Sequence, residues 1–370
     1  MIKRTLLAAT VPLLIGLSSA QAAEIYNKDG NKLDLVGKIN VSHLFSDDNN
    51  NNGDTSSYAR FGFKGETKIT DQLTGYGFWQ YQYSLRNSEG SDAQTGNRTR
   101  LGYAGLKFGK AGSLDYGRNY GLVYDVLGYT DMLPFFGGDS GYTDMLPFFG
   151  GDSGYTDAFL SGRSTGVLTW RNSDFFGLVE GLNLAAQYQG KNERSSDIDG
   201  VRRSNGDGFA LSASYDFDFG LSFAAAFASL DRTNRQNAAA RGEGEKAQHW
   251  ATSVKYDASQ VYLAAMYGET LNATPISGGF ANKAQNFEAV AQYQFPHGFR
   301  PSLGYVSSKG KEIENIGDAD IIKYTAVGAT WYFNKNMSVY GEYRINLLKD
   351  NNPLGLATDD ITALGLIYQF

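Results

Sequence analysis

Carboxylates are concentrated in one segment of the chain, residues 121–161, which contains no Lys or Arg. The segment is built around a thirteen-residue unit, GYTDMLPFFGGDS, which occurs unchanged at 128–140 and 141–153, and a third copy begins at Gly154. Carboxylates without neighbouring Lys or Arg attract cations and orient dipolar solutes. The aspartates concerned are Asp125, Asp131, Asp139, Asp144, Asp152 and Asp157.

Nucleophilic, acid–base and metal chemistry need residue sets that the chain does not supply. It contains no Cys, which excludes thiolate chemistry and a disulfide scaffold. Its three histidines, His43, His249 and His297, fall on different expected strands and at opposite ends, so they cannot form a triad or a metal cluster. We therefore expect no catalytic residues, no metal and no cofactor, which argues against an enzyme such as a protease or lipase.

The first 22 residues have the pattern of a secretory signal peptide. A basic start (Lys3, Arg4) precedes an apolar run at 6–17, and Ala-Gln-Ala at 20–22 fits a cleavage site. Without residues 1–22 the chain has 33 − 2 = 31 basic and 39 acidic side chains. The resulting net charge of 31 − 39 = −8 argues against nucleic acid as a partner.

Hydrophobicity alternates with a period of two along most of residues 23–370. In 58–69 (YARFGFKGETKI) one face is mainly apolar and the other charged, and similar patterns occur at 182–189, 209–217, 286–295 and 337–347. This period predicts β-strands rather than helices. We count about sixteen such segments, each roughly 8 to 14 residues long.

The connections between these segments alternate in length. Short ones such as 71–72, 295–298 and 333–336 alternate with long polar ones such as 46–56 and 190–207. Short turns at one end and long loops at the other are typical of an outer-membrane barrel. The fold class predicted for 23–370 is therefore all-β, a transmembrane antiparallel barrel of sixteen strands.

The polar face of each strand must point into this barrel, because a charged row does not survive against lipid. A soluble β-sandwich would need the opposite arrangement, with apolar faces inside and fewer, shorter strands. Sixteen strands with polar inner faces enclose an aqueous channel. The last strand ends on Tyr368-Gln369-Phe370, as expected where a strand meets the interfacial aromatic girdle.

Several segments give the chain a specific likeness over essentially its whole length after residue 22. It resembles the trimeric general porins of the enterobacterial outer membrane, of the porin F and porin C type. The segments that carry the resemblance are AEIYNKDGNKLDLVGK (23–38), YARFGFKGE (58–66), SEGSDAQTGNRTRL (88–101), SLDYGRNYG (113–121), RNSDFFGLVEGLN (171–183) and YFNKNMS (332–338).

The resemblance implies an architecture and a set of partners. In that family the third extracellular loop folds into the barrel and narrows it, and here this constriction loop is about 121–161. The expected assembly is a homotrimer in outer-membrane lipid and lipopolysaccharide, through which ions and small hydrophilic solutes diffuse. Phages and bacteriocins are further candidate partners for the long loops. A subunit latch is also implied, in which Glu89 reaches Arg118 of a neighbouring subunit.

The family sets basic residues of the wall against acidic residues of the loop. Strand parity supports an inward position for Lys38, Arg60 and Arg100, whereas the parity of Arg163 is ambiguous. The acidic set is Asp125, Asp131, Asp139, Asp144 and Asp152. The basic set implied by the resemblance is Lys38, Arg60, Arg98, Arg100 and Arg163.

The chain departs from the family at the constriction. The family's single aspartate in YTDM has two counterparts, Asp131 and Asp144, and the sequence does not choose between them. Phe135 and Phe148 stand where the family has a glutamate, and Phe78 stands at an inward position that is usually polar. These three aromatics are too few for the continuous row that a sugar-specific porin would need.

We therefore expect a passive, weakly cation-selective diffusion channel, narrowed by the second copy and by the bulk of Phe135 and Phe148. Thirteen extra residues can span about 43 Å when extended. The alternative is that the second copy bulges towards the vestibule without obstructing the passage.

Overall fold

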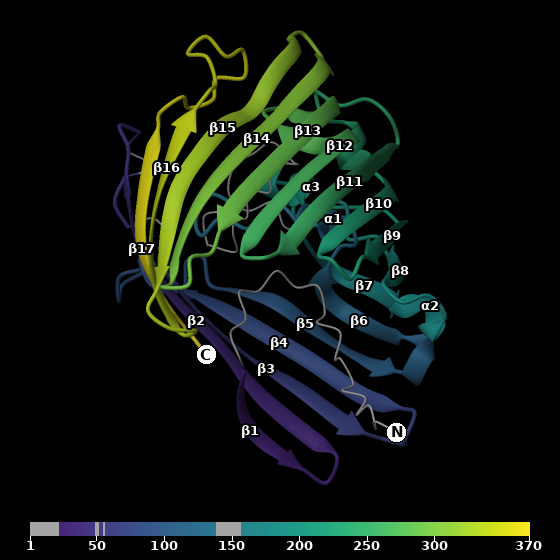
Figure 1. Cartoon of the computed structure of the whole chain (residues 1–370). Helices are drawn as coiled ribbons and strands as arrows, with labels where there is room; N and C mark the ends of the chain where they lie inside the picture. The colour runs from purple at the N-terminus through teal and green to yellow at the C-terminus, as the bar shows by residue number, and fades with distance from the viewer. Residues whose placement is uncertain (1–21, 49–51, 55, 138–156) are drawn as a thin grey trace.

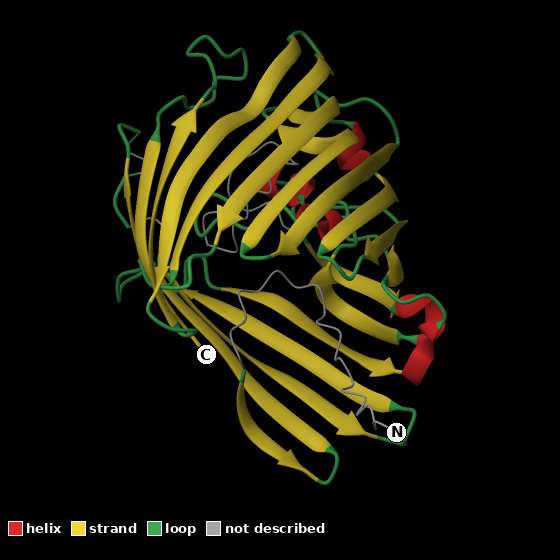
Figure 2. Ribbon diagram, viewed as in Figure 1, coloured by secondary structure: helices red, strands yellow, loops and turns green. Residues whose placement is uncertain are grey.

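The computed structural model describes residues 22–48, 52–54, 56–137 and 157–370, and the expected signal peptide therefore lies almost entirely outside the described residues. Strands account for most of the chain (Figure 2). Their bounds are β1 (Ala23–Lys28), β2 (Asn31–Phe45), β3 (Tyr58–Lys68), β4 (Thr74–Ser84), β5 (Arg98–Lys107), β6 (Ser113–Tyr120), β7 (Arg163–Asn172), β8 (Leu182–Gln189), β9 (Gly208–Asp216), β10 (Leu221–Asp231), β11 (Lys246–Ala258), β12 (Val261–Ile276), β13 (Gly279–Tyr293), β14 (Phe299–Ile313), β15 (Gly317–Tyr332), β16 (Met337–Asn346) and β17 (Ile361–Gln369).

Strands β2 to β17 form the predicted closed barrel of sixteen antiparallel strands (Figure 1). Each pairs with the strand before and after it, and the ring closes where β17 pairs with β2, from Thr362 opposite Phe45 to Gln369 opposite Lys38. A closed ring leaves no unpaired strand edge, which a strand-built membrane protein requires. The sequence prediction of the fold class is confirmed.

The two ends of the described chain share one edge of β2. Strand β1 pairs with β2 from Asn31 to Leu35, and β17 pairs with its later part. Between them, Gly37 and Phe370 exchange two backbone hydrogen bonds of 2.9 Å. The Phe370 ring packs directly over Gly37, where an added Cβ would meet it at 2.2 Å and push the ring aside.

The alternation predicted from sequence separates an apolar outer wall from a polar inner wall. On the outer wall, large side chains such as Ile39, Val41 and Trp79 are exposed. A lipid-facing apolar band of this kind is what a membrane-spanning barrel needs. No helix in the described part of the chain is long and apolar enough to cross a membrane.

Short helices occur only in the connections of the described chain. They are η2 (Gly109–Ala111), α1 (Tyr124–Leu127), α2 (Asp174–Gly177), α3 (Ile198–Arg202) and α4 (Asn234–Asn237). Helix α1 opens the segment after β6 and lies against β10 and β11 (Figure 1).

The buried apolar core lies inside the barrel, between the loop after β6 and the inner wall. Val126, Leu127 and other apolar residues between 122 and 136 are buried in one cluster with small wall residues. Alanine leaves room on a strand for a packed segment, whereas a larger residue would push that segment away. The alanines of the β9, β10 and β11 wall in this cluster are Ala210, Ala224, Ala226, Ala228, Ala247 and Ala251.

Candidate pore and constriction loop

A band of basic residues crosses the inner wall of β2, β3 and β5. In the strand register Lys38 lies opposite Arg60, Arg60 opposite Gln82, and Gln82 opposite Arg98. Arg100 lies beside this row at an irregularity of the β4–β5 pairing, between Gln80 and Tyr81. The structure therefore brings together four of the five predicted basic residues. We call Lys38, Arg60, Arg98 and Arg100 the basic row.

Two glutamines hold the guanidinium groups of this row. Arg60 Nε donates to Gln82 Oε1 at 2.7 Å, and Arg100 Nη1 donates to the same oxygen at 3.4 Å. Arg100 Nε also donates to Gln80 Oε1 at 3.2 Å. The Arg60 guanidinium lies 4.1 Å from the ring centroid of Tyr58, within range of a cation–π interaction. The amides fix the positions of these cations without neutralising their charge.

The two ends of the constriction loop are paired with each other. Gly121 N donates to Gly162 O at 2.9 Å, and Val123 N donates to Leu160 O at 3.3 Å. An added Cβ on Gly121 would lie 1.9 Å from Leu160 O, so this close approach needs glycine. The loop thus leaves and re-enters the barrel wall through one narrow neck.

Asp157 fastens the returning end of the loop. Its carboxylate accepts two 2.9 Å hydrogen bonds from Arg118 Nη1 and forms an ion pair with Arg194 Nη2 at 3.2 Å. Its Oδ1 also accepts from Thr165 N at 2.8 Å. Arg118, the predicted latch residue, is therefore engaged within its own chain, and its latch role remains a prediction. Arg163 lies at the same neck, where its carbonyl oxygen accepts from Asp157 N at 2.8 Å.

Asp125 fastens the first part of the loop to the neighbouring strands β7 and β9. The Arg171 guanidinium on β7 binds this carboxylate through two hydrogen bonds of 2.9 and 3.0 Å. Ser212 on β9 donates a third at 2.6 Å. A bidentate guanidinium–carboxylate pair is directional as well as strong, so it orients α1 against the wall. Asp125 is thus bound to Arg171 in the described structure, and the basic row lies on other strands.

The loop then crosses β12 and β13 on their inner faces. Tyr262 OH donates to Tyr129 O at 2.7 Å, and Gln292 Nε2 donates to Met132 O at 2.9 Å. Between these points, the Thr130 hydroxyl donates to the carboxylate of Glu288 on β13. The Tyr129 side chain is buried here, and this burial raises the pKa of its hydroxyl.

Further along, the loop reaches β15 and β16. The Glu342 Oε2 atom accepts from the backbone N–H groups of Phe135 and Phe136 at 2.8 and 2.9 Å. Tyr324 OH donates to Phe136 O at 2.7 Å. The Phe135 ring is fully buried and packs on Phe136, with 4.9 Å between ring centroids. The ring of Phe135 is thus packed against the wall. The narrowing that its bulk was expected to cause remains a prediction.

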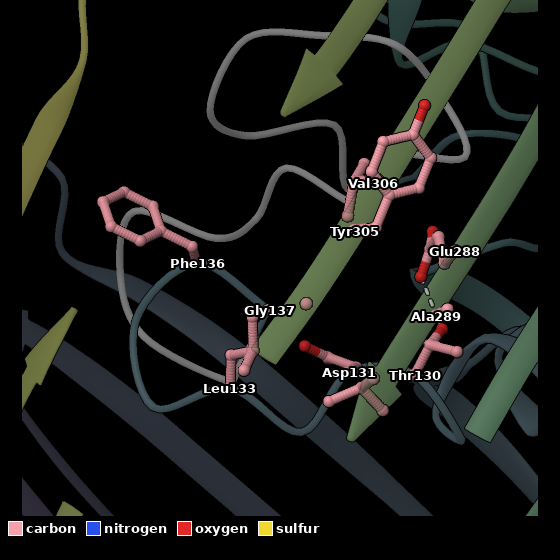
Figure 3. Close-up of a pocket in the computed structure, with 11 residues that line it drawn as sticks. Thr130, Asp131, Leu133, Phe136, Gly137, Glu288, Ala289, Tyr305 and Val306 are labelled. Carbon is pink, nitrogen blue, oxygen red and sulfur yellow. Dashed lines mark hydrogen bonds between the residues drawn. The ribbon is translucent and has the colours of Figure 1, made fainter. Parts of the chain in front are cut away.

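A small pocket lies between the first repeat copy and the wall of β13 and β14 (Figure 3). Thr130, Asp131 and Leu133 border it from the loop, and Glu288 and Tyr305 border it from the wall. Asp131 accepts a hydrogen bond of 2.7 Å from Tyr124 OH within the loop. Among the described residues, no group of three or more His, Cys, Asp or Glu side chains could hold a metal ion.

The remaining predicted residues fall into two groups. Glu89 lies in the loop between β4 and β5, which is stabilised by its own contacts, including hydrogen bonds from Ser88 that lower the pKa of Asp92. Asp139, Asp144, Asp152 and Phe148 lie outside the described residues. Their proposed part in the constriction remains a prediction.

Sequence reasoning missed the wall residues that hold the loop, namely Arg171, Glu288 and Glu342. Each is a charged residue on the inward parity of its strand, which is a visible signal for a lumen position. What the sequence lacks is the loop path, because partners such as Phe135 and Glu342 are 207 positions apart.

A closed strand barrel with an apolar outer wall, a polar inner wall and a loop fastened inside it defines a transmembrane channel protein. A family model described as Gram-negative porin matches residues 28–141 and 140–370, two segments that meet at the end of the first repeat copy. The chain belongs to the Gram-negative porin family.

Known proteins agree with this assignment over the full length. Outer membrane porin F of Escherichia coli strain K12 is 55% identical over 381 residues, with 100% of both chains covered. Outer membrane porin PhoE of Enterobacter cloacae is 54% identical over 371 residues, again with 100% of both covered. A structure of Salmonella typhi OmpF in complex with daunomycin matches with a TM-score of 0.83 at 47% identity, covering 94% of this chain and 100% of that one.

The family and the fold establish the general activity. The protein is a general diffusion porin of the Gram-negative outer membrane, and it is a channel rather than an enzyme. The predictions of family, location and non-enzymatic function are confirmed.

Proposed function

We propose that the channel conducts ions and small hydrophilic solutes with a weak preference for cations, and that the duplicated loop narrows it. The observation that carries this proposal is the path of the first repeat copy, which is fastened across the inner wall from Tyr262 to Glu342. The chain leaves the described part at Gly137, beside the wall residues Gly304 and Val306. The described part of the first copy therefore ends beside the inner wall.

The charges on the two sides of the passage support a weak rather than a strong preference. The loop sequence carries six aspartates. One of them, Asp125, is bound to Arg171 and not to the basic row. A pair of unit charges about 7 Å apart in water interacts by only about 0.6 kcal/mol. Energies of this size bias passage without trapping an ion, which conduction requires.

Removal of one repeat copy tests the narrowing. Because the copies are identical, deletion of either 128–140 or 141–153 gives the same chain. Single-channel conductance in a planar bilayer should rise well above that of the intact protein. A control deletion of residues 350–353, in the loop between β16 and β17, should leave conductance unchanged. Equal conductance of the intact and shortened proteins would contradict the narrowing while leaving the diffusion channel itself intact.

Which copy lies against the wall can be tested by single substitutions. Thr130→Val removes the hydroxyl that donates to Glu288, and Thr143→Val makes the same change in the second copy. If the first copy occupies the wall, only Thr130→Val should alter the current noise of the open channel. The opposite result would assign the wall contacts to the second copy.

The functional unit that we propose is a homotrimer in lipid and lipopolysaccharide, with Glu89 bound to Arg118 of a neighbouring subunit. The support is the family resemblance and the position of Arg118 on β6, beside the outward-facing Tyr116, which is 62% exposed. Exposed ion pairs are usually worth less than about 1 kcal/mol, so the latch would adjust trimer stability rather than determine it.

A further inference from the structure

Three aromatic side chains form a cluster on the inner wall of β4 and β5. The ring centroids of Phe78 and Tyr103 are 5.9 Å apart, and those of Tyr76 and Tyr103 are 6.3 Å apart. The first pair is tilted and the second is edge-to-face, which are the favourable geometries for aromatic pairs. All three side chains are only partly buried. We call Tyr76, Phe78 and Tyr103 the aromatic cluster.

Strand alternation and hydrogen bonding both show that this cluster faces the lumen. Gln80 and Gln82 share its parity on β4 and bind the guanidinium groups of the basic row. The intervening Trp79 has the opposite parity and is 38% exposed on the outer wall. Tyr76 OH donates to Asp115 Oδ2 on the inner face of β6 at 2.9 Å. Phe78 therefore presents a ring to the aqueous passage, where a polar side chain would be better solvated.

Charged residues of both signs surround the cluster, and the basic row lies beyond it. In the strand register Phe78 lies opposite Lys64 on β3 and Tyr103 on β5. Lys107 Nζ lies 5.1 Å from the Tyr76 ring centroid and 2.8 Å from Glu66 Oε1. The basic row begins level with the next inward-facing residue of β4 after Gln80, which is Gln82, towards the long loop after β4. Lys64 and Lys107 both pair with Glu66, at 3.7 and 2.8 Å, so an anion beside these rings would find its surplus of positive charge in the basic row.

We propose that the aromatic cluster is a transit subsite for planar aromatic carboxylates. A solute of this class would stack its ring on Phe78 and Tyr103 and direct its carboxylate towards the basic row. Along β4 the cluster lies between the short β3–β4 turn and the basic row, so a solute that crosses the barrel passes the cluster and the basic row in turn. The proposal requires only the diffusion channel and is independent of the ion preference and of the second repeat copy.

The test uses the assembled channel in a planar bilayer with 2-naphthoate added on the short-turn side. We expect interruptions of the ion current that last longer than those caused by cyclohexanecarboxylate, which has the same charge but no aromatic face. Phe78→Gln should shorten the mean 2-naphthoate interruption about two- to tenfold, the effect of losing one aromatic contact. Tyr103→Leu should act in the same direction.

A control variant separates stacking in the lumen from a general change in the barrel. Phe63→Leu removes a ring from the outer wall of the neighbouring strand, at the adjacent register position. It should leave the interruptions unchanged, and each current record shows that the variant has folded and inserted. The proposal is wrong if intact protein and Phe78→Gln give equal interruptions, if Phe63→Leu shortens them equally, or if the two carboxylates act alike on the intact channel.

Discussion

Glu342 is the wall residue whose removal should most clearly release the constriction loop. Its side chain is 2% exposed, and one oxygen accepts from two consecutive loop N–H groups, those of Phe135 and Phe136. In Glu342→Ala both N–H groups lose their acceptor, at about 1–3 kcal/mol each. Water in the lumen would recover part of this, so we take about 3 kcal/mol for the loss of loop anchoring. That value corresponds to a roughly 100-fold increase in the detached population.

Single-channel recording measures this effect directly. We expect Glu342→Ala to increase the current noise of the open channel and to lower the voltage at which the channel closes. The barrel should still assemble, because the hydrogen bonds of the strand ladder do not depend on this side chain. Glu342→Gln keeps an oxygen that can accept both hydrogen bonds, so its channel should resemble that of the intact protein.

Two results would refute this reasoning. If Glu342→Ala has the noise and closing voltage of the intact protein, the two N–H bonds do not hold the loop. If Glu342→Gln changes the current as much as Glu342→Ala does, the negative charge of Glu342 matters rather than its acceptor oxygen.

Three further predictions concern charge and assembly. Arg100→Gln should raise the cation preference about two- to threefold, measured as the potential across a salt gradient, because one charge about 7 Å away is worth about 0.6 kcal/mol. The control Arg300→Gln, near the short turn after β13, should have a smaller effect. Phe135→Glu should increase cation preference and conductance, and unchanged values in both measurements would contradict a part for Phe135 in the constriction. Glu89→Ala should lower the dissociation temperature of the trimer, and an unchanged temperature would reject the latch. Asp157→Ala instead removes the bond between Asp157 and Arg118 within one chain.

The barrel could be predicted from sequence because its signal is repeated in every strand. The pattern at 58–69 already separates an inward Arg60 from the outward Phe61 and Phe63, and the ladder then fixes the neighbours. Lys38 and Arg60 follow from the same parity, whereas Arg100 and Tyr103 have opposite parity and share the lumen because the β4–β5 pairing is irregular between them. Arg163 could not be assigned this way, because β7 contains an irregularity opposite β6 that shifts the alternation near its start.

The loop contacts could not be predicted, because they depend on where an irregular segment meets the wall. Phe135 illustrates the difficulty, since nothing in the sequence of the repeat indicates that its ring is fully buried. One sequence signal was nevertheless available. Strand β10 has alanine at Ala224, Ala226 and Ala228 on its inward parity, and small residues there leave room for a packed segment.

One half of the barrel wall binds the constriction loop, and the other half carries the side chains that face the passage. Strands β7 to β16 hold the loop through Arg171, Glu288 and Glu342, so much of their polar surface is already bonded. Strands β2 to β5 carry the basic row and the aromatic cluster, and the described loop residues bind the other wall. We therefore expect a permeating solute to interact chiefly with β2 to β5. Since the two repeat copies are identical, the wall cannot distinguish them by residue type. Asp125 and Asp157 fix the two ends of the segment, and the comparison of Thr130→Val with Thr143→Val decides which copy makes the wall contacts.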